Sequence, residues 1–321
     1  MKTINLTEQL CFTGSLPGPY RGSIRNVLTG AGFQALRDRE EPRSVVSPAL
    51  ISDLPDYLDI EMRNLGEDLH CIAIPQYEGY LIDLTKFSDA EDFFAKSLGK
   101  NSRKNFRSKF RKLEAEHTIR FEFYFGHIDK THYDALFDVC YRLMEERFQE
   151  KKIYNRNLLV WKDYYKLFYP LILDKKASIF AIYDDEKPIT LTLNFHAGDI
   201  VFSHIQIYDT DYSRYSMGDI AIYKNVEWCY EHGYKVWDFS KGATDNKQRW
   251  SNHIYTFNFH LIHKNTALAR GRARFFERKL RLKQQLREKG IIGGRFQLDG
   301  LYFYTKRRQL RQHNWKEGSQ D

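Results

Sequence analysis

The hydrophobic pattern between residues 119 and 262 changes its period in a fixed order, and this order restricts the fold more than any other feature of the chain. Residues 119–125 alternate apolar and polar side chains, the two-residue period of a half-buried strand. Residues 130–151 and 158–173 instead repeat apolar side chains every three or four positions, which is the period of a helix with one buried face. The segment therefore begins as strand, helix, helix.

Short apolar segments separated by turn residues follow these helices. The sequence predicts three strands at 177–183, 189–196 and 200–208, a helix at 217–233, and two more strands at 235–239 and 254–262. Strands and helices in this order favour an α+β fold in which helices flank one mixed sheet.

The two ends of the chain show weaker patterns. Residues 1–45 read as loop around Pro17 to Pro19 and as an exposed helix over 37–43. A basic amphipathic helix is expected within residues 264–289, and a terminal helix near 301–310. The organisation we predict is an N-terminal half over 1–115, a second domain over 116–265 and a basic helical tail over 266–321.

The composition predicts a folded protein with anionic partners. Hydrophobic residues make up 42% of the chain and aromatic residues 15%, so the mean hydropathy of -0.60 reflects a charged surface and not disorder. The net charge of +8 favours nucleotides, coenzyme A, tRNA or anionic lipid as partners, without choosing among them.

The cysteines and the apolar segments point to a reduced, soluble, cytoplasmic protein. The four cysteines, Cys11, Cys71, Cys140 and Cys229, are far apart and lack the spacing of a zinc site, so we expect reduced thiols and no metal. The first residues lack the order of a signal peptide, and every apolar run is too short to cross a bilayer. Peripheral contact with the inner membrane face is compatible with this expectation.

Three segments carry a resemblance to a known family. They are residues 98–107, rich in lysine and arginine, residues 215–219 at a helix start, and Trp237 to Gly242 followed by Lys247 to Trp250. Over roughly residues 80–262 the chain resembles the GNAT superfamily of acyltransferases, and within it the CelD-type and Fem-like (peptidoglycan bridge aminoacyltransferase-like) domains. The resemblance implies two GNAT-like halves, the first of them degenerate.

The resemblance also implies a donor site in the loop before the helix at residue 217. Ser213, Arg214, Ser216 and Gly218 would hold the donor's phosphates, since the free N–H groups at a helix start favour an anion. The family's pattern places two small residues there, whereas this loop has the single glycine Gly218. The alternative is an ordinary helix cap with a solvated arginine.

The resemblance to Fem-like proteins further implies that a basic helix face binds the phosphates of a nucleotide-linked or tRNA-linked substrate. Arg103, Arg107 and Arg111 lie four positions apart and therefore share one face of a helix. A solvated charged surface is the alternative.

Three residues are candidates for the chemical step. Lys247, in the segment most similar to the family, could stabilise an oxyanion or hold a donor phosphate. Asp238 ends a strand, where open sheets often place functional groups, although it could equally cap a helix. His204 lies in the middle of a predicted strand and could deprotonate the attacking ammonium, or could simply be a hydrogen-bonded core residue.

These expectations describe an N-acyltransferase or aminoacyltransferase. It would use acyl-CoA or aminoacyl-tRNA as a co-substrate, hold no permanent cofactor, and act on an amine of an envelope or sugar precursor. tRNA and an anionic membrane surface are further candidate partners, and DNA is not expected. The alternative is a non-catalytic module that binds RNA or a membrane surface, for example through the basic helix, whose default role is to dock on the protein's own sheet.

Overall fold

The computed structural model describes residues 1–36, 48–292, 305, 315 and 316, and it divides into two compact units. The first, unit 1, contains Met1–Phe93, His196–Phe202 and Cys229–Ile292, and the second, unit 2, contains Phe94–Phe195, Ser203–Trp228 and the described residues after 292. Each unit is therefore built from segments that lie far apart in the sequence. The predicted exposed helix at 37–43 and most of the predicted terminal helix at 301–310 lie outside the described residues.

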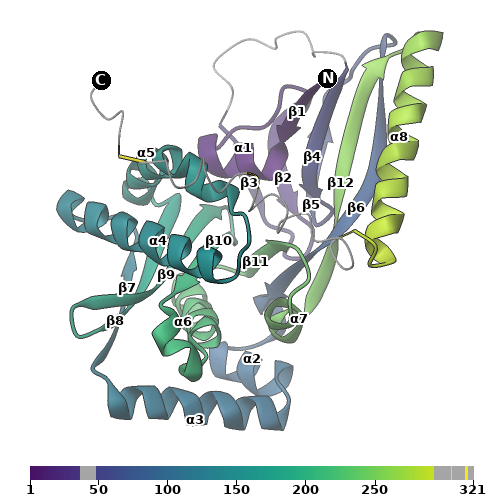
Figure 1. Ribbon diagram of the computed structural model, residues 1–321. Coiled ribbons are helices and arrows are strands. Elements are labelled where there is room, and N and C mark those ends of the chain that lie inside the picture. Colours follow the sequence, from purple (N-terminus) through teal and green to yellow (C-terminus); the bar gives the residue numbers. More distant parts are fainter. Residues whose placement is uncertain (37–47, 293–304, 306–314, 317–321) are drawn as a thin grey trace. The chain divides into compact units, whose positions relative to one another are not determined.

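Unit 1 is organised around a mixed sheet. Its strands lie in the order β1, β4, β12, β6, β11, and the first residues of β10 pair parallel with β11. Their bounds are β1 Lys2–Asn5, β4 Ala49–Pro55, β12 His253–Lys264, β6 Leu69–Asp83, β11 Val236–Lys241 and β10 Ile200–Tyr208. Two of these strands, β6 and β12, form a long antiparallel pair that is visible in Figure 1.

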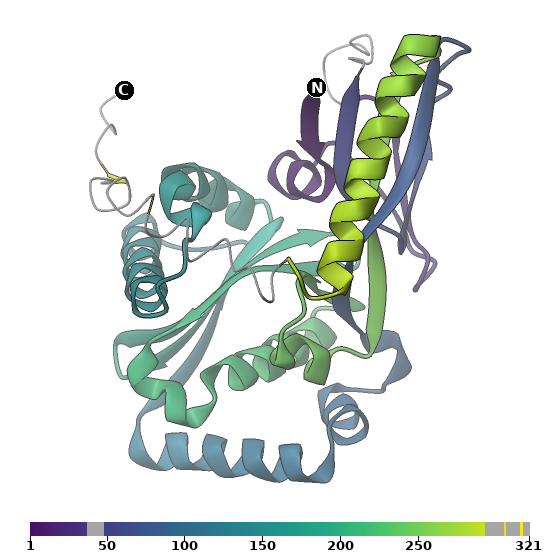
Figure 2. The same cartoon turned by 45° about the vertical axis from the view of Figure 1, so that its right-hand side comes forward.

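Smaller elements complete unit 1. The strands β2 (Tyr20–Asn26), β3 (Gly32–Gln34) and β5 (Leu58–Met62) form a separate three-stranded sheet, and the helices are α1 (Leu6–Thr13), α7 (Asp245–Trp250) and α8 (Ala267–Glu288). Helix α8 runs along β6 and β12, where Ala273 packs in a cluster with Leu50, Ile74 and Leu261 (Figure 2). The basic helix therefore docks on the protein's own sheet, as expected.

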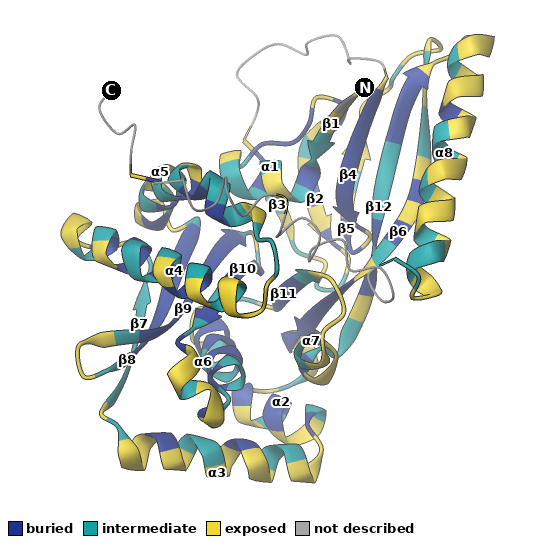
Figure 3. Cartoon of the chain, in the orientation of Figure 1, coloured by how far each residue is buried: buried dark blue, intermediate teal, exposed yellow. Residues whose placement is uncertain are grey.

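Unit 2 contains the sheet order β10, β9, β8, β7, with helices on both faces. The elements are β7 Ile119–Tyr124, β8 Ala177–Asp184, β9 Lys187–Ala197, α3 Lys100–Glu116, α4 Lys130–Glu150, α5 Trp161–Leu173 and α6 Met217–Glu231, while α2 spans Ala90–Ser97. Phe168 of α5 packs on Phe195 of β9, whereas Trp228 of α6 stacks on Phe123 of β7. Neighbouring residues of a strand face opposite sides of the sheet, and helices cover both sides. The strands β8 and β9 are therefore buried along most of their length (Figure 3).

The structure confirms the predicted mixed sheet and most elements after residue 119. The prediction missed α7, and a 3₁₀ helix, η3 (Thr210–Tyr215), occupies most of the predicted loop before α6. The N-terminal strands β1 to β5 were not predicted as a set. Among the helices that the structure describes, none combines the length and apolar character needed to cross a membrane.

Candidate active site

A buried carboxylate lies in the middle of β11 and not at the end of the strand, because β11 continues to Lys241. Asp238 is 1% exposed, and its side chain accepts hydrogen bonds from the hydroxyl of Tyr57 at 2.6 Å and from that of Tyr255 at 2.8 Å. The backbone N–H of Ser240 donates a third at 2.6 Å, and Ser240 itself has a left-handed backbone with φ of 62°. The backbone of β11 is therefore irregular beside this carboxylate, where the pairing with β6 also shifts its register.

Burial raises the pKa of Asp238 to about 6, because the charged form loses its hydration. The hydrogen bonds from Tyr57, Ser240 and Tyr255, together with the positive charge of Lys247, act in the opposite direction and limit the rise. At neutral pH the group is therefore an ionised carboxylate inside the protein, held by three donors.

Lys247 lies on the short helix α7 that follows β11. The N-cap of α7 is Thr244, whose hydroxyl accepts a hydrogen bond from the backbone N–H of Lys247 at 3.3 Å. The Nζ atom of Lys247 donates to the carbonyl of Lys241 at 2.7 Å. Because Thr244 caps this helix, Asp238 does not, and the capping alternative for Asp238 is not what the structure shows.

Two of the predicted chemical residues are electrostatically coupled in unit 1. Burial lowers the pKa of Lys247 to about 8, the charge of Asp238 raises it, and the charge of Lys241 lowers it. A lysine with this pKa remains mainly protonated at pH 7 but can lose its proton in mildly alkaline solution. Such a perturbed pair is typical of functional sites, although structural ion pairs produce it as well.

A second buried carboxylate, Asp53 of β4, adjoins this pair and was missed in the sequence. It is 4% exposed and forms a 2.7 Å ion pair with Nζ of Lys241, whose carbonyl accepts the bond from Lys247. The amide of Asn5 donates to it at 2.7 Å, and the hydroxyl of Tyr77 is a further donor. Its φ of 59° places a non-glycine residue in the left-handed region, which is a strained conformation.

The predicted donor loop lies in unit 2 and is only partly exposed. Ser216 ends the 3₁₀ helix η3 with a left-handed φ of 58°, and α6 begins at the next residue. The hydroxyl of Ser216 accepts a hydrogen bond from Nζ of Lys109 on α3 at 2.8 Å. The carbonyl of Gly218 accepts from the amide of Gln206 at 3.0 Å, while Ser213 lies exposed.

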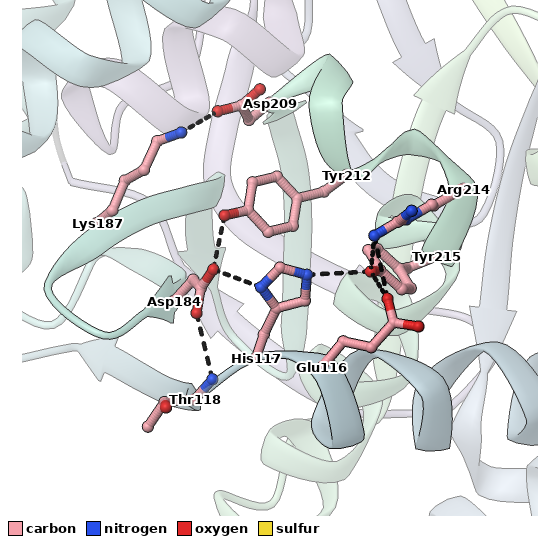
Figure 4. A network of polar contacts seen from close by, with 9 residues as sticks. All are labelled: Glu116, His117, Thr118, Asp184, Lys187, Asp209, Tyr212, Arg214 and Tyr215. Carbon is pink, nitrogen blue, oxygen red and sulfur yellow. Dashed lines mark hydrogen bonds and ion pairs between the residues drawn. The ribbon is translucent and has the colours of Figure 1, made fainter.

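A network of polar contacts fastens this loop to the end of α3 (Figure 4). His117 contacts the carboxylate of Asp184 at 2.7 Å through Nδ1 and the hydroxyl of Tyr215 at 3.0 Å through Nε2. The hydroxyl of Tyr215 donates to Glu116, which pairs with Arg214 at 3.0 Å. Arg214 is therefore engaged with a carboxylate, although its side chain is 62% exposed.

Asp184 accepts a further hydrogen bond in this network. The hydroxyl of Tyr212 donates to its carboxylate at 2.6 Å. Although burial alone would raise the pKa of Asp184, the hydrogen bonds from Tyr212 and His117 lower it below its usual value. The ionised form of this carboxylate is therefore stabilised by its partners, in contrast to Asp238.

The three predicted substrate-binding arginines of α3 differ in their surroundings. Arg103 donates to the carbonyl of Leu98 at 2.8 Å and to that of Ala95, so its guanidinium satisfies carbonyls at the end of α2. Arg107 lies over the ring of Phe94 at 5.4 Å and is exposed. Nε of Arg111 donates to the carbonyl of Arg107 at 3.2 Å. The exposed pair remains the better candidate for an anion.

His204 of β10 lies between two rings in unit 2. The ring of Tyr164 is 5.1 Å away and that of Phe195 is 5.2 Å away, with part of the imidazole exposed. Within the described residues, no group of His, Cys, Asp and Glu side chains gathers in a way that could hold a metal ion. The structure thus brings Asp238 and Lys247 together in one unit, and places His204 and the loop in the other.

The sequence matches one family model. Residues 100–248 match the acetyltransferase (GNAT) domain, a stretch that contains α3, the loop before α6, Asp238 and Lys247. No curated protein matches the chain. The match confirms the GNAT resemblance, while the CelD-type and Fem-like branch remains a prediction.

Several solved structures are distantly similar. A conserved protein of unknown function from Bacteroides thetaiotaomicron is 10% identical with a TM-score of 0.44, and the match covers 67% of this chain and 69% of that one. The C-terminal domain of a candidate lysylphosphatidylglycerol synthetase from Agrobacterium fabrum is 13% identical with a TM-score of 0.45, covering 77% and 74%. FemX is 10% identical with a TM-score of 0.43, covering 56% and 61%.

These likenesses are too distant to support an argument about the reaction, which rests on the family match alone. Residues 100–248 hold both the basic helix and the polar cluster around β11. Residues 100–248 are therefore similar to the acetyltransferase (GNAT) domain, and the class of activity that this match supports is that of a transferase that moves an acyl group.

Proposed function

We propose that the protein moves an acyl or aminoacyl group from a thioester or a tRNA ester to an amine of an envelope or sugar precursor. The observation that carries the proposal is the coupled pair of Lys247 and Asp238, with a pKa of about 8 for the lysine and of about 6 for the carboxylate. Between about pH 6 and pH 8 both groups are mainly charged, so the ammonium of Lys247 is present beside the carbonyl of Lys241 at the end of β11.

The chemistry requires a charge near the carbonyl oxygen of the donor. The acceptor amine attacks the carbonyl carbon, the new C–N bond forms as the C–S or C–O bond breaks, the amine loses one proton and the leaving group gains one. We assign to the ammonium of Lys247 the stabilisation of the oxyanion in the tetrahedral intermediate. Asp238 favours the charged form of Lys247. His204 of unit 2 is a separate candidate base, and burial lowers the pKa of its imidazole to about 4.

A separate phosphate-binding site is proposed within unit 2. The support is the helix start at Met217, where the helix dipole attracts an anion, together with the nearby basic helix α3. Ser213 is exposed, and Ser216 and Gly218 are partly exposed, so the backbone of this loop is accessible to a ligand. Arg214 would have to exchange its partner Glu116 for a donor phosphate.

The proposal is tested by binding and by product formation. Acyl-CoAs and charged tRNAs are screened for a rise in melting temperature, and the hits are incubated with amines and analysed by mass spectrometry for the new amide. We expect stabilisation by one class of donor, and about tenfold weaker affinity in Gly218→Val, whose branched side chain obstructs close approach of the backbone. Stabilisation by generic polyanions alone, without amide formation, would instead support the non-catalytic binding module.

A further inference from the structure

One face of helix α8 carries large apolar side chains that point away from the sheet. Leu268 is 67% exposed, Phe275 is 73% exposed and Leu282 is 56% exposed. These residues are seven positions apart, so they lie in one row that extends from the first turn of the helix over about two thirds of its length. The opposite side of the helix, which includes Ala273, packs on β6 and β12, so the row is on the outer side (Figure 3).

The same helix is strongly basic. Its 22 residues include eight lysine and arginine side chains and two glutamates, one of which, Glu277, pairs with Arg281 at 2.8 Å. Arg272 and Lys279 follow the apolar row at the next helical positions and are exposed. Apolar side chains flanked by basic ones are the composition of a helix that lies in the plane of a membrane interface.

We infer that the outer face of α8 binds an anionic phospholipid surface. Leu268, Phe275 and Leu282 would enter the boundary between headgroups and acyl chains, while the basic side chains beside them contact lipid phosphates. This places unit 1 on a bilayer without a spanning helix. The inference does not depend on the proposed reaction, since it uses residues outside the segment that matches the acetyltransferase domain.

The side chains favour lipid over the other partners that a basic helix can have. A nucleic acid would be held through its phosphates, and a row of leucine and phenylalanine adds nothing to such contacts. A second copy of the same face would bring two sets of like charges together, which repel each other. Anionic lipid supplies both a negative surface and an apolar layer.

The test is sedimentation of the full chain with vesicles of phosphatidylcholine alone or with about a third phosphatidylglycerol. We expect binding only to the anionic vesicles, and at least about tenfold weaker partitioning for the variant Leu268→Ser, Phe275→Ser, Leu282→Ser, because apolar burial adds to the charge attraction. The matched control is Val27→Ser, Leu173→Ser, which removes exposed apolar side chains elsewhere and should bind like the unmodified protein.

A second variant separates charge from apolar insertion. Arg272→Gln with Lys279→Gln should also weaken binding, and added salt should weaken it further. Equal partitioning of the unmodified protein and the triple serine variant would overturn the inference, since binding would then be electrostatic alone. Tight binding of a single-stranded RNA without binding to anionic vesicles would overturn it too, as would binding to neither.

Discussion

The cluster around Asp238 in unit 1 and the network around His117 in unit 2 are both rich in tyrosine and carboxylate, yet they have opposite electrostatics. Asp238 is completely enclosed, and burial raises its pKa to about 6 in spite of three hydrogen-bond donors. Asp184 is partly exposed, and its partners lower its pKa. The surroundings of Asp238 therefore disfavour its ionised form, whereas those of Asp184 favour it.

This difference separates a candidate chemical site from a structural fastening. A buried charge that lowers stability is typical of a functional group. The role we assign to Asp238 is to favour the charged form of Lys247. A charge that its partners stabilise needs no further reason, because it holds the loop before α6 to the end of α3. Both clusters contain predicted site residues, Asp238 in the first and Arg214 in the second. The sequence does not show which carboxylate is buried, whereas the structure does.

The sharpest test of the comparison is Lys247→Ala, together with Lys247→Met. Removing one charge that stabilises an oxyanion typically lowers turnover by about 100- to 1,000-fold, or roughly 3 to 4 kcal/mol. The melting temperature should change little, because Lys247 is only partly buried. Steady-state kinetics on a confirmed donor and acceptor measures the effect, and Lys264→Ala, an exposed lysine of the same unit, is the control.

An effect on KM alone, relieved by excess donor, would instead assign Lys247 to donor binding. Unchanged turnover and affinity in both variants would make it an ordinary surface lysine and remove it from the site.

The second test concerns the stability of Asp238→Asn as a function of pH. The pKa of Asp238 is raised in the folded state from 3.8 to about 6, so its contribution to stability is full below the lower value and is lost as the pH rises through the higher one. Relative to the variant, the unmodified protein should lose about 2 kcal/mol between pH 4 and pH 7, which is most of the full effect of a shift of about two pKa units.

Urea denaturation at several pH values measures this difference, with Asp245→Asn as an exposed control in the same unit. The alkaline limb of the rate profile should also move to lower pH in Asp238→Asn, since Asp238 raises the pKa of Lys247. A constant stability difference across the range would show that Asp238 is not a buried, ionised carboxylate.

The network in unit 2 should respond in the opposite way. His117→Ala removes two contacts and should lower the free energy of unfolding by about 1 to 2 kcal/mol. Because the pKa of Asp184 is lowered, its contribution is present above its usual value of 3.8 and is lost as the pH falls through the lowered one. Tyr212→Phe removes a single bond to Asp184 and should cost less.

Thermal and urea unfolding at neutral pH compare the two variants. If His117→Ala lowered turnover as strongly as Lys247→Ala while leaving stability unchanged, the network around His117 would have a catalytic role. The distinction between a structural network in unit 2 and a chemical site in unit 1 would then be wrong.

The smallest effects are expected on α3. Arg103→Ala should lower stability by about 1 kcal/mol, since it leaves carbonyls at the end of α2 without their donor. The double variant Arg107→Ala, Arg111→Ala should change stability by a few tenths of a kcal/mol only, as is usual for exposed charges. If these two hold donor phosphates, the double variant should nevertheless lose most of the salt dependence of donor binding.

Titration of the donor at two ionic strengths makes this comparison. A salt dependence that is the same with and without Arg107 and Arg111 would leave them as a solvated surface.

The sequence predicted the elements of unit 2 well. Helix α4 buries one face and has the period of such a helix, while β8 and β9 are short apolar segments bounded by turn residues. In contrast, β4 of unit 1 is also buried at every position, but Ser52, Asp53 and Pro55 interrupt its apolar residues, so the segment does not read as a buried strand. The other N-terminal strands are short, and β3 has only three residues.

The candidate site was predictable in part for the same reason. Asp238 lies in a recognisable strand, and Lys247 follows that strand closely in the sequence. Asp53 could not be paired with Lys241, because 188 positions separate them and only the packing of β4, β12, β6 and β11 brings them together. The left-handed backbone of Asp53 has no signal in the sequence either, since asparagine and glycine are the usual markers of that conformation.

The position of β12 between β4 and β6 also dictates an order of events during synthesis. Its residues 253–264 leave the ribosome long after both neighbours, so until then β4 and β6 are separate strands, each with an open edge. Pairing over such a sequence distance is slow, and open edges favour association between chains. A nascent chain that stops before His253 would therefore lack the central strand of unit 1, and its two orphaned neighbours would be sites for chaperone binding or aggregation.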